Sequence, residues 1–349
     1  MKRVLIVRLS AMGDVIFNIP LANILKYNGY EVTWIVSEKG YELIKDNPAV
    51  DEAILAPIEK WKKQPLKQNI KEYFEIIKYL RSKKFDIAID TQLLLKSYIW
   101  TAFCGAKRRI VSKSAREFAI LGGNEVIEKL RTDFSKHVTN NYLKFARHLN
   151  INFTDINVTL PPVTNEIKQK IDELLKDADT SKPILTLAPA TTWETKHWDK
   201  NNWRDLVARL ENDYTLIFTG TSKDEGLIKY ISGGNHLSVA GKTSILELAE
   251  VFRRSELLIS LDSGSTHLGW ATGAPKIVSI FCSTPASHYA PLGSSEKYIA
   301  VSGTLPCQPC HKKHCPMSEG MVNQCTLYPS VDEVYSAVQK LSPIATKCF

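Results

Sequence analysis

Several short polar segments carry the side chains best suited to chemistry, and each directly follows an apolar run. In the first, Ser10-Ala-Met-Gly-Asp14, a glycine permits a tight turn before a helix begins. An anionic Asp14 is stabilised there by free amide groups and by the positive end of the helix dipole. The carboxylate therefore has two interpretations: a general base that faces a ligand, or a cap of the helix.

A second segment, Ala188-Pro-Ala-Thr-Thr-Trp-Glu-Thr-Lys-His-Trp198, combines adjacent hydroxyl groups with a cation. Thr191 and Thr192 can donate hydrogen bonds, and Lys196 supplies a positive charge, so the loop could hold a diphosphate. The alternative is an ordinary surface lysine beside tryptophans that pack in the core, an interpretation that we favour for Trp198.

Two further segments of the second half suit a nucleotide sugar. Ser260-Leu-Asp-Ser-Gly-Ser-Thr-His267 predicts an anion-binding nest at a helix start, with Asp262 available to sugar hydroxyls. A carboxylate within Gly220-Thr-Ser-Lys-Asp-Glu225 could bind a ribose diol. The alternatives are a capped turn with a packed histidine and an acid that stabilises a helix N-terminus.

Four of the seven cysteines crowd into a short segment, Cys307-x2-Cys310-x4-Cys315-x9-Cys325. The spacing could close a tetrahedral structural zinc site, although it does not match the commonest finger spacings. The alternative, which we favour, is a loop of reduced thiols. Met1–Leu9 is interpreted as a first strand and not as a signal peptide, so we expect a reducing, cytoplasmic compartment.

Charge separates the two halves of the chain. Residues 1–160 hold 26 basic and 17 acidic side chains, whereas residues 161–349 hold 19 and 20. The first half should therefore meet an anionic partner: a phosphorylated substrate, a membrane surface or a nucleic acid. The segment Lys60-Trp-Lys-Lys63 and Arg116 are its candidate contacts, and Trp61 is interpreted as packing on a sugar, on a membrane or in the core.

The elements that must position these segments alternate between apolar strands and amphipathic helices, with 44% hydrophobic residues overall. This composition excludes a disordered or fibrous protein, and no apolar run approaches the ~20 residues of a membrane span. The expected strands are Val4–Leu9, Val32–Val36, Ala49–Ala56, Phe85–Asp90, Lys107–Val111, Ile184–Leu187, Thr215–Phe218, Leu237–Ala240, Leu257–Leu261 and Ile277–Phe281. The expected helices are Val15–Tyr27 and residues 66–83, 164–177, 200–211, 223–232, 244–254 and 266–272.

Alternating strands and helices predict an α/β fold with two Rossmann-like parallel-sheet domains that face each other across a cleft. The proline-stiffened Thr159–Val163 is the expected linker, which gives domains 1–160 and 161–349. Packing of the C-terminal helix on the first domain is an alternative that the sequence leaves open. The helix 66–83 is expected to bury Leu66, Ile70, Phe74, Ile77 and Leu80, which recur at helical spacing.

Together these motifs resemble the family-9 glycosyltransferases, the ADP-heptose:lipopolysaccharide heptosyltransferases. The resemblance runs over nearly the whole chain, through Val4–Asp14, Asp90–Ser97, Ala190–Trp198 and Asp262–His267. It implies a GT-B fold and an inverting transfer that needs no metal and no cofactor. The motifs are most similar to members that move heptose from ADP-L-glycero-D-manno-heptose to the Kdo of Kdo-lipid A, in lipopolysaccharide inner-core synthesis.

The resemblance also implies roles for individual residues. Asp14 matches the general base, in an acceptor-binding first domain, and the second domain would hold the nucleotide sugar. The donor-binding positions are Thr191, Thr192, Lys196, Asp224, Asp262, Ser263, Gly264 and His267. The acceptor-binding positions are Ser10, Gly13, Lys60, Lys62, Lys63 and Arg116. Asp224 stands where the family has glutamate, and Glu59 where it has an arginine of the acceptor cluster.

Alternatives remain open within and beyond this family. A second-heptose transferase, or a family member with another acceptor or sugar donor, fits the same motifs. A Rossmann oxidoreductase is disfavoured because the G-x-G-x-x-G fingerprint is missing, and a nucleic-acid-binding protein because no recognition motif is present. We expect a monomer without nucleic-acid partners, held peripherally at the anionic inner leaflet of the inner membrane.

Overall fold

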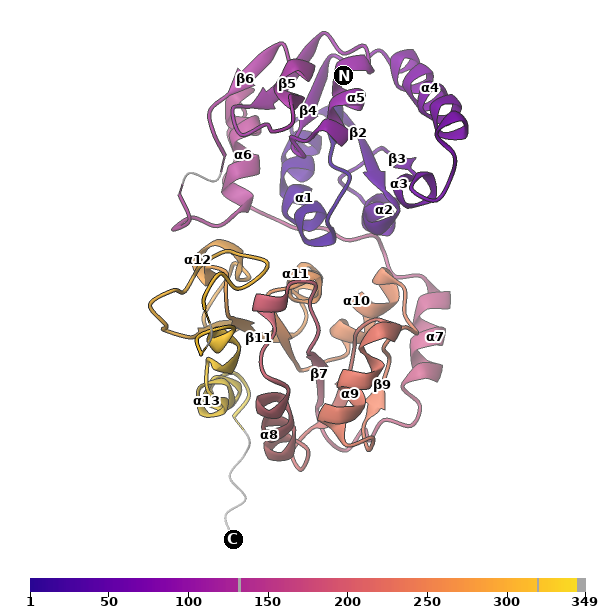
Figure 1. Cartoon of the computed structure of the whole chain (residues 1–349). Coiled ribbons are helices and arrows are strands. Elements are labelled where there is room, and N and C mark those ends of the chain that lie inside the picture. Colours follow the sequence, from indigo (N-terminus) through magenta and orange to yellow (C-terminus); the bar gives the residue numbers. More distant parts are fainter. Residues whose placement is uncertain (131–132, 319, 344–349) are drawn as a thin grey trace. The chain divides into compact units, whose positions relative to one another are not determined.

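The computed structural model describes residues 1–130, 133–318 and 320–343. The chain folds into two compact units, Met1–Pro162 and Val163–Phe349, each built around its own parallel sheet (Figure 1). Among the described residues, no helix combines the length and the apolar character needed to cross a membrane.

The sheet of the N-terminal unit has the strand order β3-β2-β1-β4-β5-β6, and neighbouring strands run parallel. Its central strands are buried on both faces, as expected where helices cover a parallel sheet. Val7 pairs with Asp90, so the loops that follow β1 and β4 leave the sheet side by side. The strands are β1 (Lys2–Val7), β2 (Tyr30–Ser37), β3 (Glu52–Ala56), β4 (Ile87–Asp90), β5 (Arg108–Ser112) and β6 (Glu125–Ile127).

The helices of this unit follow its strands and close both faces of the sheet. They are α1 (Met12–Tyr27), α2 (Glu38–Ile44), α3 (Ile58–Trp61), α4 (Leu66–Ser82), α5 (Leu95–Phe103), the 3-10 turn η1 (Ala119–Gly122) and α6 (Thr139–His148). The expected buried face of α4 was only partly right. Ile77 and Leu80 pack inward, but Ile70 is 46% and Phe74 67% exposed.

A stack of three aromatic rings fills the core between α3, α4 and α5. The Tyr73 ring centroid lies 4.0 Å from that of Trp61 and 5.1 Å from that of Trp100. Trp61 is buried, and its Nε1 donates to Glu72 Oε2 at 2.7 Å. Of the three interpretations of Trp61, the structure therefore favours core packing over contact with a sugar or a membrane.

The sheet of the C-terminal unit has the order β12-β11-β10-β7-β8-β9 and is again parallel. Its strands are β7 (Ile184–Ala188), β8 (Thr215–Phe218), β9 (Leu237–Ser238), β10 (Leu257–Leu261), β11 (Lys276–Phe281) and β12 (Tyr298–Ser302). Its helices are α7 (Asn165–Leu174), α8 (Lys200–Leu210), α9 (Glu225–Ser232), α10 (Ile245–Arg253), α11 (Gly264–Thr272), α12 (Ala286–Tyr289) and α13 (Val331–Leu341), with 3-10 turns η2 (Glu194–Lys196), η3 (Ser222–Asp224) and η4 (Gln324–Leu327).

The C-terminal helix α13 packs on α8, β11 and β12 of its own unit. Val334, Val338 and Leu341 enter the same apolar cluster as Leu216 and Phe218. The described part of this helix thus completes the core of the C-terminal unit.

Trp100→Ala tests the aromatic stack. The side chain is fully buried against the rings of Tyr73 and Trp61, so its loss should lower the free energy of unfolding by about 3–5 kcal/mol. Urea denaturation followed by circular dichroism measures the change. Phe103→Ala on the same helix is the control, because Phe103 is 46% exposed and should cost about 1 kcal/mol or less. Equal effects of the two changes would contradict the stack as a stabilising element.

Candidate active site

In the N-terminal unit, Ser10, Gly13 and Asp14 follow the carboxyl end of β1, which lies beside that of β4. Asp14 lies in the first turn of α1, and its Oδ2 accepts from the amide of Ala11 at 3.5 Å. The same oxygen lies 2.5 Å from Arg8 Nη2, and Tyr142 Oη donates to Oδ1 at 3.2 Å. The carboxylate is therefore a helix cap and is also held by two side chains from other parts of the unit.

Arg8 is buried, with an exposed fraction of 3%. Its Nη1 donates to the carbonyl of Thr91 at 2.6 Å, which ties the loop after β1 to the loop after β4. Gln92 Oε1 strengthens this connection by accepting from the amides of Leu9 and Ser10 at 3.0 and 3.1 Å. Because the Arg8 guanidinium is buried and hydrogen-bonded, it can adopt few conformations, and its ion pair with Asp14 therefore restricts the position of that carboxylate.

The loop after β4 is organised by a second carboxylate, Asp90, which is fully buried. Its Oδ1 accepts from the amides of Gln92 and Leu93, both at 2.9 Å, and its Oδ2 from Ser97 Oγ at 2.8 Å. Burial raises the pKa of Asp90 to about 6, against the lowering effect of these hydrogen bonds and of Arg8. Asp90 thereby shapes the loop that carries Gln92.

Lys96 contacts Ser10 directly, whereas Lys60 and Lys62 contact carboxylates. Lys96 Nζ donates to Ser10 Oγ at 2.8 Å. The pKa of Lys96 is lowered mainly by burial and, to a smaller extent, by the positive charges of Arg8 and Lys62. Two lysines of the expected acceptor cluster, in which Lys96 was not included, have carboxylate partners: Lys60 Nζ lies 2.7 Å from Glu72 Oε1, and Lys62 Nζ lies 2.9 Å from Glu59 Oε1.

The other three expected acceptor positions after Ser10, Lys60 and Lys62 are Gly13, Lys63 and Arg116. Lys63 and Arg116 are exposed, and Gly13 lies in the first turn of α1. The structure thus brings Ser10 and Asp14 together with Lys96, and it leaves Lys60 and Lys62 engaged in local ion pairs.

In the C-terminal unit, the loops after β7 and β10 meet around Asp262, which is 2% exposed. Lys196 Nζ lies 2.7 Å from Asp262 Oδ2, and Thr284 Oγ1 donates to the same oxygen at 2.5 Å. His267 Nε2 lies 3.5 Å from Oδ1. Burial acts to raise the pKa of Asp262, but the hydrogen bond from His267 and the charge of Lys196 outweigh it, so the pKa lies well below its usual range.

The remaining donor positions lie around this group or beside it. Thr191 Oγ1 donates to the carbonyl of Asp262 at 3.5 Å, and the neighbouring Thr192 is exposed. Ser263 is the N-cap of α11, and Gly264 is the first residue of that helix. A helix that begins directly after a strand offers its first amides to an anion.

Asp224 stands apart in η3, where its Oδ2 accepts from the amide and the hydroxyl of Thr221 at 2.7 and 2.8 Å. These contacts are those of a turn cap. The Trp193 ring faces the Lys196 ammonium, with 4.6 Å between Nζ and the ring centroid, while Trp198 is buried as expected.

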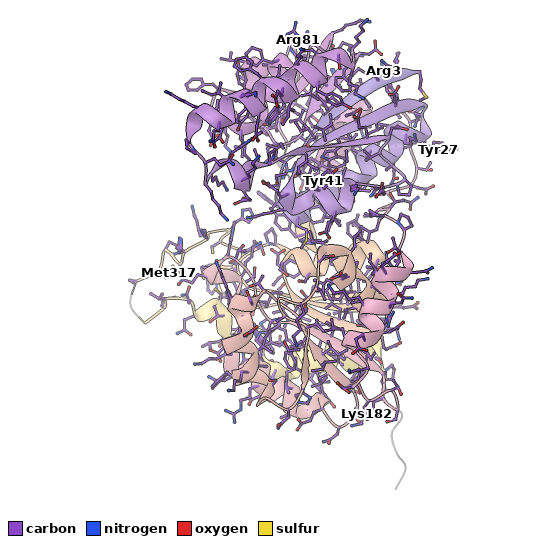
Figure 2. The ribbon with its side chains drawn as sticks, turned by 90° about the vertical axis from the view of Figure 1, so that its right-hand side faces the viewer. Arg3, Tyr27, Tyr41, Arg81, Lys182 and Met317 are labelled. Atoms are coloured by element: carbon purple, nitrogen blue, oxygen red, sulfur yellow. The ribbon has the colours of Figure 1, made fainter. Side chains whose placement is uncertain are left out.

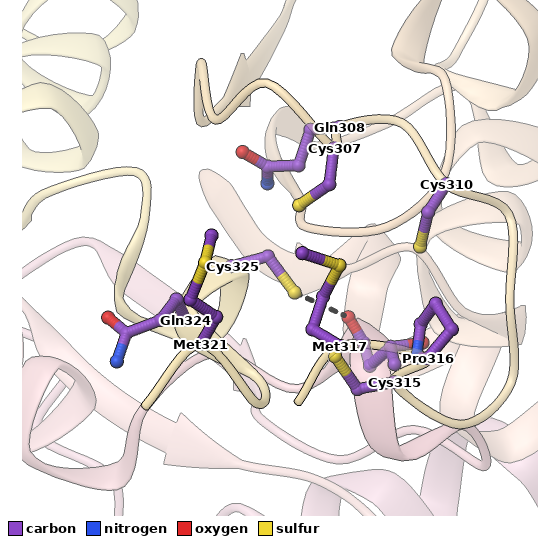
Figure 3. Close-up of a pocket in the computed structure, with 10 residues that line it drawn as sticks. Cys307, Gln308, Cys310, Cys315, Pro316, Met317, Met321, Gln324 and Cys325 are labelled. Atoms are coloured by element: carbon purple, nitrogen blue, oxygen red, sulfur yellow. Dashed lines mark hydrogen bonds between the residues drawn. The ribbon is translucent and has the colours of Figure 1, made fainter. Parts of the chain in front are cut away.

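The cysteine segment lies against the Lys196 loop. Cys307, Cys310, Cys315 and Cys325 line a cavity of about 20 Å³ together with Thr195 (Figure 3). No three His, Cys, Asp or Glu side chains within residues 1–130, 133–318 and 320–343 are arranged to hold a metal ion, so the four sulfurs do not form the zinc ligand set that their spacing allowed. Burial raises the pKa of the Cys325 thiol to about 11 and keeps it neutral. Cys348 lies outside the described residues.

Instead of a ligand set, this segment provides hydrogen bonds to η2. Thr195 Oγ1 donates to the carbonyl of Lys312 and to Ser283 Oγ. Glu194 receives bonds from His314 Nδ1 and Asn323 Nδ2. The segment therefore fixes the two residues that precede Lys196.

Comparison with known proteins agrees with this geometry. The family model Glycosyltransferase family 9 (heptosyltransferase) matches residues 73–320. Lipopolysaccharide heptosyltransferase 1 of Pseudomonas aeruginosa is 27% identical over 90% of this chain and 87% of its own length, and that of Salmonella typhimurium is 26% identical over 79% and 87%. Lipooligosaccharide heptosyltransferase 2 of Haemophilus ducreyi is 23% identical over 86% and 88%.

Solved structures show the same architecture. The family-9 glycosyl transferase of Veillonella parvula superposes with a TM-score of 0.81 at 19% identity, over 97% of both chains. Heptosyltransferase II of E. coli gives 0.76 at 18% identity over 98% of both, and E. coli heptosyltransferase WaaC gives 0.69 at 22% over 97% and 99%.

Two parallel-sheet units with polar loops at the carboxyl ends of their strands, matched by these solved structures, show the GT-B fold. The chain belongs to glycosyltransferase family 9, the heptosyltransferases. The fold class and the family expected from the sequence are thus confirmed.

Three residues of the site in the N-terminal unit did not follow from sequence motifs. Arg8 is the one charged side chain inside the apolar run Val4–Leu9, and that isolation was the available signal. Lys96 lies within the quoted segment Asp90–Ser97 but was given no role. Tyr142 comes from α6, a helix that the sequence analysis did not predict, so its contact with Asp14 was beyond reach.

Asp90→Asn tests whether burial raises the pKa of Asp90 in the folded chain. The pKa of Asp90 is higher in the folded chain, at about 6, than its ordinary value of 3.8, so the folded state binds the proton more tightly. The contribution of Asp90 to stability should therefore fall as pH rises from about 4 to about 6, by about 3 kcal/mol in total. Asparagine cannot ionise, and its oxygen can still accept from both amides.

Urea denaturation of both proteins across this pH range measures the effect. The free energy of unfolding of the variant relative to the parent chain should rise between pH 4 and pH 6 and then level off. A difference that does not change with pH would mean that Asp90 titrates normally.

Proposed function

We propose that this enzyme transfers heptose from ADP-L-glycero-D-manno-heptose to the Kdo of Kdo-lipid A, with inversion and without a metal ion, and so adds the first heptose of the lipopolysaccharide inner core. The observation that carries the proposal is the Asp14 carboxylate, held by Arg8 and Tyr142 beside the Ser10–Lys96 pair. Named relatives support the acceptor, because several lipopolysaccharide heptosyltransferases 1 are 24–27% identical to this chain.

Asp14 would act as the general base. A sugar hydroxyl is a weak nucleophile, and a positioned carboxylate that takes its proton accelerates attack by ~10²–10⁴. The hydroxyl oxygen would form a bond to the anomeric carbon as the bond to the ADP oxygen breaks, and a single displacement of this kind inverts the anomeric centre. The ion pair with Arg8 keeps the carboxylate oriented.

Lys196 and the start of α11 would stabilise the leaving ADP. The Lys196 ammonium is fixed by Asp262 and faces Trp193, so its remaining protons are oriented before the diphosphate arrives. Preorganised donors of this kind stabilise charge that develops in the transition state. Thr191, Thr192, Ser263, Gly264 and His267 complete the proposed diphosphate site, and Asp224 would release its turn contacts to bind the ribose.

The N-terminal unit suits an acceptor that carries carboxylates and phosphates. Its excess of 26 basic over 17 acidic side chains gives the long-range attraction. Lys96 and Ser10 adjoin Asp14, and the exposed Lys63 and Arg116 are available for phosphates. Lys60 and Lys62 would have to exchange carboxylate partners to take part. We propose a monomer that works at the cytoplasmic face of the inner membrane.

A second candidate is transfer to an acceptor that already carries a heptose. The observation that favours it is Glu59, which pairs with Lys62 and Lys39 and so reduces the positive charge of the acceptor cluster. The two candidates are separated by kcat/KM for ADP release with Kdo-lipid A and with heptosyl-Kdo-lipid A. At least a tenfold preference for Kdo-lipid A, about 1.4 kcal/mol, is expected, and the opposite preference would support the second candidate.

Asp14→Asn tests the base. Asparagine keeps an oxygen for the capping contact but loses the ion pair with the buried Arg8, so the variant should unfold at a lower temperature, while its affinity for ADP, which the other unit is proposed to bind, should be unchanged. Because the amide cannot accept the proton, kcat should fall by about 10²–10⁴. Steady-state kinetics, calorimetry with ADP and thermal unfolding measure the three quantities. A variant that keeps more than about a third of the turnover would show that Asp14 only caps the helix.

Lys196→Met tests the diphosphate site while keeping an aliphatic stem over Trp193. Loss of a charge-assisted hydrogen bond should weaken ADP binding by about 1.5–3 kcal/mol, measured by calorimetry. Lys182→Ala is the control, since Lys182 precedes β7 and so lies at the other end of that strand (Figure 2). Unchanged ADP affinity in Lys196→Met, with a folded variant, would move the diphosphate site elsewhere.

A further inference from the structure

An apolar tip projects from the N-terminal unit beside the Asp14 site. It consists of Leu95, Phe118, Ile120 and Leu121, which are 52%, 80%, 38% and 69% exposed. The amide of Leu95 donates to Glu117 Oε2 at 3.1 Å, and η1 packs on α5, so the four side chains belong to one region of the surface.

The tip is a built feature of the fold. Within the turn, Ala119 and Gly122 point inward and are buried, while the large apolar residues between and beside them face outward. Arg109 Nε donates to the carbonyl of Gly122 at 3.0 Å, and a Cβ added at Gly122 would approach the Tyr98 ring to 3.2 Å. The small residues are therefore required on the inner side of the turn.

The backbone also holds Phe118 outward. Glu117 and Phe118 have φ values of 56° and 64°, in the left-handed region that bulky side chains rarely adopt. An exposed phenylalanine in such a conformation gains nothing from burial within its own unit. An apolar cluster of this kind, surrounded by polar residues, is typical of an interaction surface.

Charge indicates the partner. Arg116 and Lys113 are exposed beside the tip, and Lys96 follows Leu95 in the chain. The unit that carries the tip holds 26 basic and 17 acidic side chains. Apolar side chains in a basic surround suit an anionic lipid surface, where the rings enter the headgroup boundary and the cations meet phosphates.

We infer that Leu95, Phe118, Ile120 and Leu121 insert into the interface of an anionic bilayer and so hold the Ser10–Asp14 edge at the level of the lipid headgroups. The inference deepens the proposed function. It rests on that function in one respect, namely that the acceptor is anchored in a lipid bilayer. It also relocates the membrane contact from Lys60–Lys63, because Trp61 is buried and two of those lysines are ion-paired.

Vesicle flotation of the full chain tests the binding directly. The vesicles contain phosphatidylcholine alone, or phosphatidylcholine with about a third phosphatidylglycerol. The parent chain should bind the anionic vesicles more strongly, and Phe118→Ser/Leu121→Ser should weaken this binding about tenfold or more. Tyr27→Ser is the matched control, because Tyr27 is 92% exposed at the end of α1 (Figure 2), and it should bind as the parent chain does.

Kinetics with two forms of the acceptor separate the tip from the chemistry. The double variant should keep the parent kcat/KM on deacylated, soluble Kdo acceptor and lose activity on acceptor embedded in anionic vesicles. Equal vesicle binding by parent and double variant would overturn the inference. A parent dimer that the double variant converts to a monomer, measured by sedimentation, would assign the tip to a second copy and also overturn it. If no acceptor is heptosylated, the proposed function fails, and flotation still decides the role of the tip.

Discussion

The loops of the C-terminal unit depend on the neutralisation of one buried carboxylate. Asp262 is almost inaccessible to solvent, and Lys196, His267 and Thr284 converge on its two oxygens. Removing one partner of a buried ion pair typically costs about 3–5 kcal/mol, so this group holds the loops after β7 and β10 together. The cysteine segment acts on the same loop from outside, through Thr195 and Glu194.

The N-terminal unit also contains an ion pair with one buried partner, but here the buried partner is the cation. There the cation, Arg8, is buried and the carboxylate, Asp14, is the more exposed partner, with 28% of its side chain accessible. A fixed cation beneath an accessible carboxylate suits a base that must meet a substrate. A fixed carboxylate beneath a partly accessible lysine suits the binding of a diphosphate. The two units thus present opposite charges at the carboxyl ends of their strands, in agreement with the membership of the chain in a glycosyltransferase family.

Much of the sheet architecture could be predicted from the sequence, because strands buried on both faces are continuous apolar runs. The predicted bounds of Thr215–Phe218 and Leu257–Leu261 agree with β8 and β10. The missed strands, β6 and β12, are edge strands: β6 has only three residues, and β12 is apolar in sequence but no more than half-buried. The helix α6 was missed as well, and with it the contact between Tyr142 and Asp14.

The sequence predicted which residues belong to the site, but it did not predict the contacts between them. The motifs placed Asp14, Lys196 and Asp262 in segments that follow strands, and in the structure these residues follow β1, β7 and β10. Their partners, such as Arg8 and Thr284, come from elsewhere in the chain and depend on tertiary packing. Lys60 shows the converse, because its ion pair with Glu72 joins residues twelve positions apart, whereas Lys62 pairs with Glu59 at the local i,i+3 spacing.

The most direct test of the central claim is the structure of the product formed from ADP-heptose and Kdo-lipid A. Mass spectrometry combined with NMR of the new anomeric proton determines the number of sugars added, their attachment and their configuration. A single heptose on Kdo, with an anomeric configuration opposite to that of the donor, is the predicted result. Retention of the donor configuration would contradict direct displacement assisted by Asp14, and transfer only to an acceptor that already carries heptose would contradict the proposed acceptor.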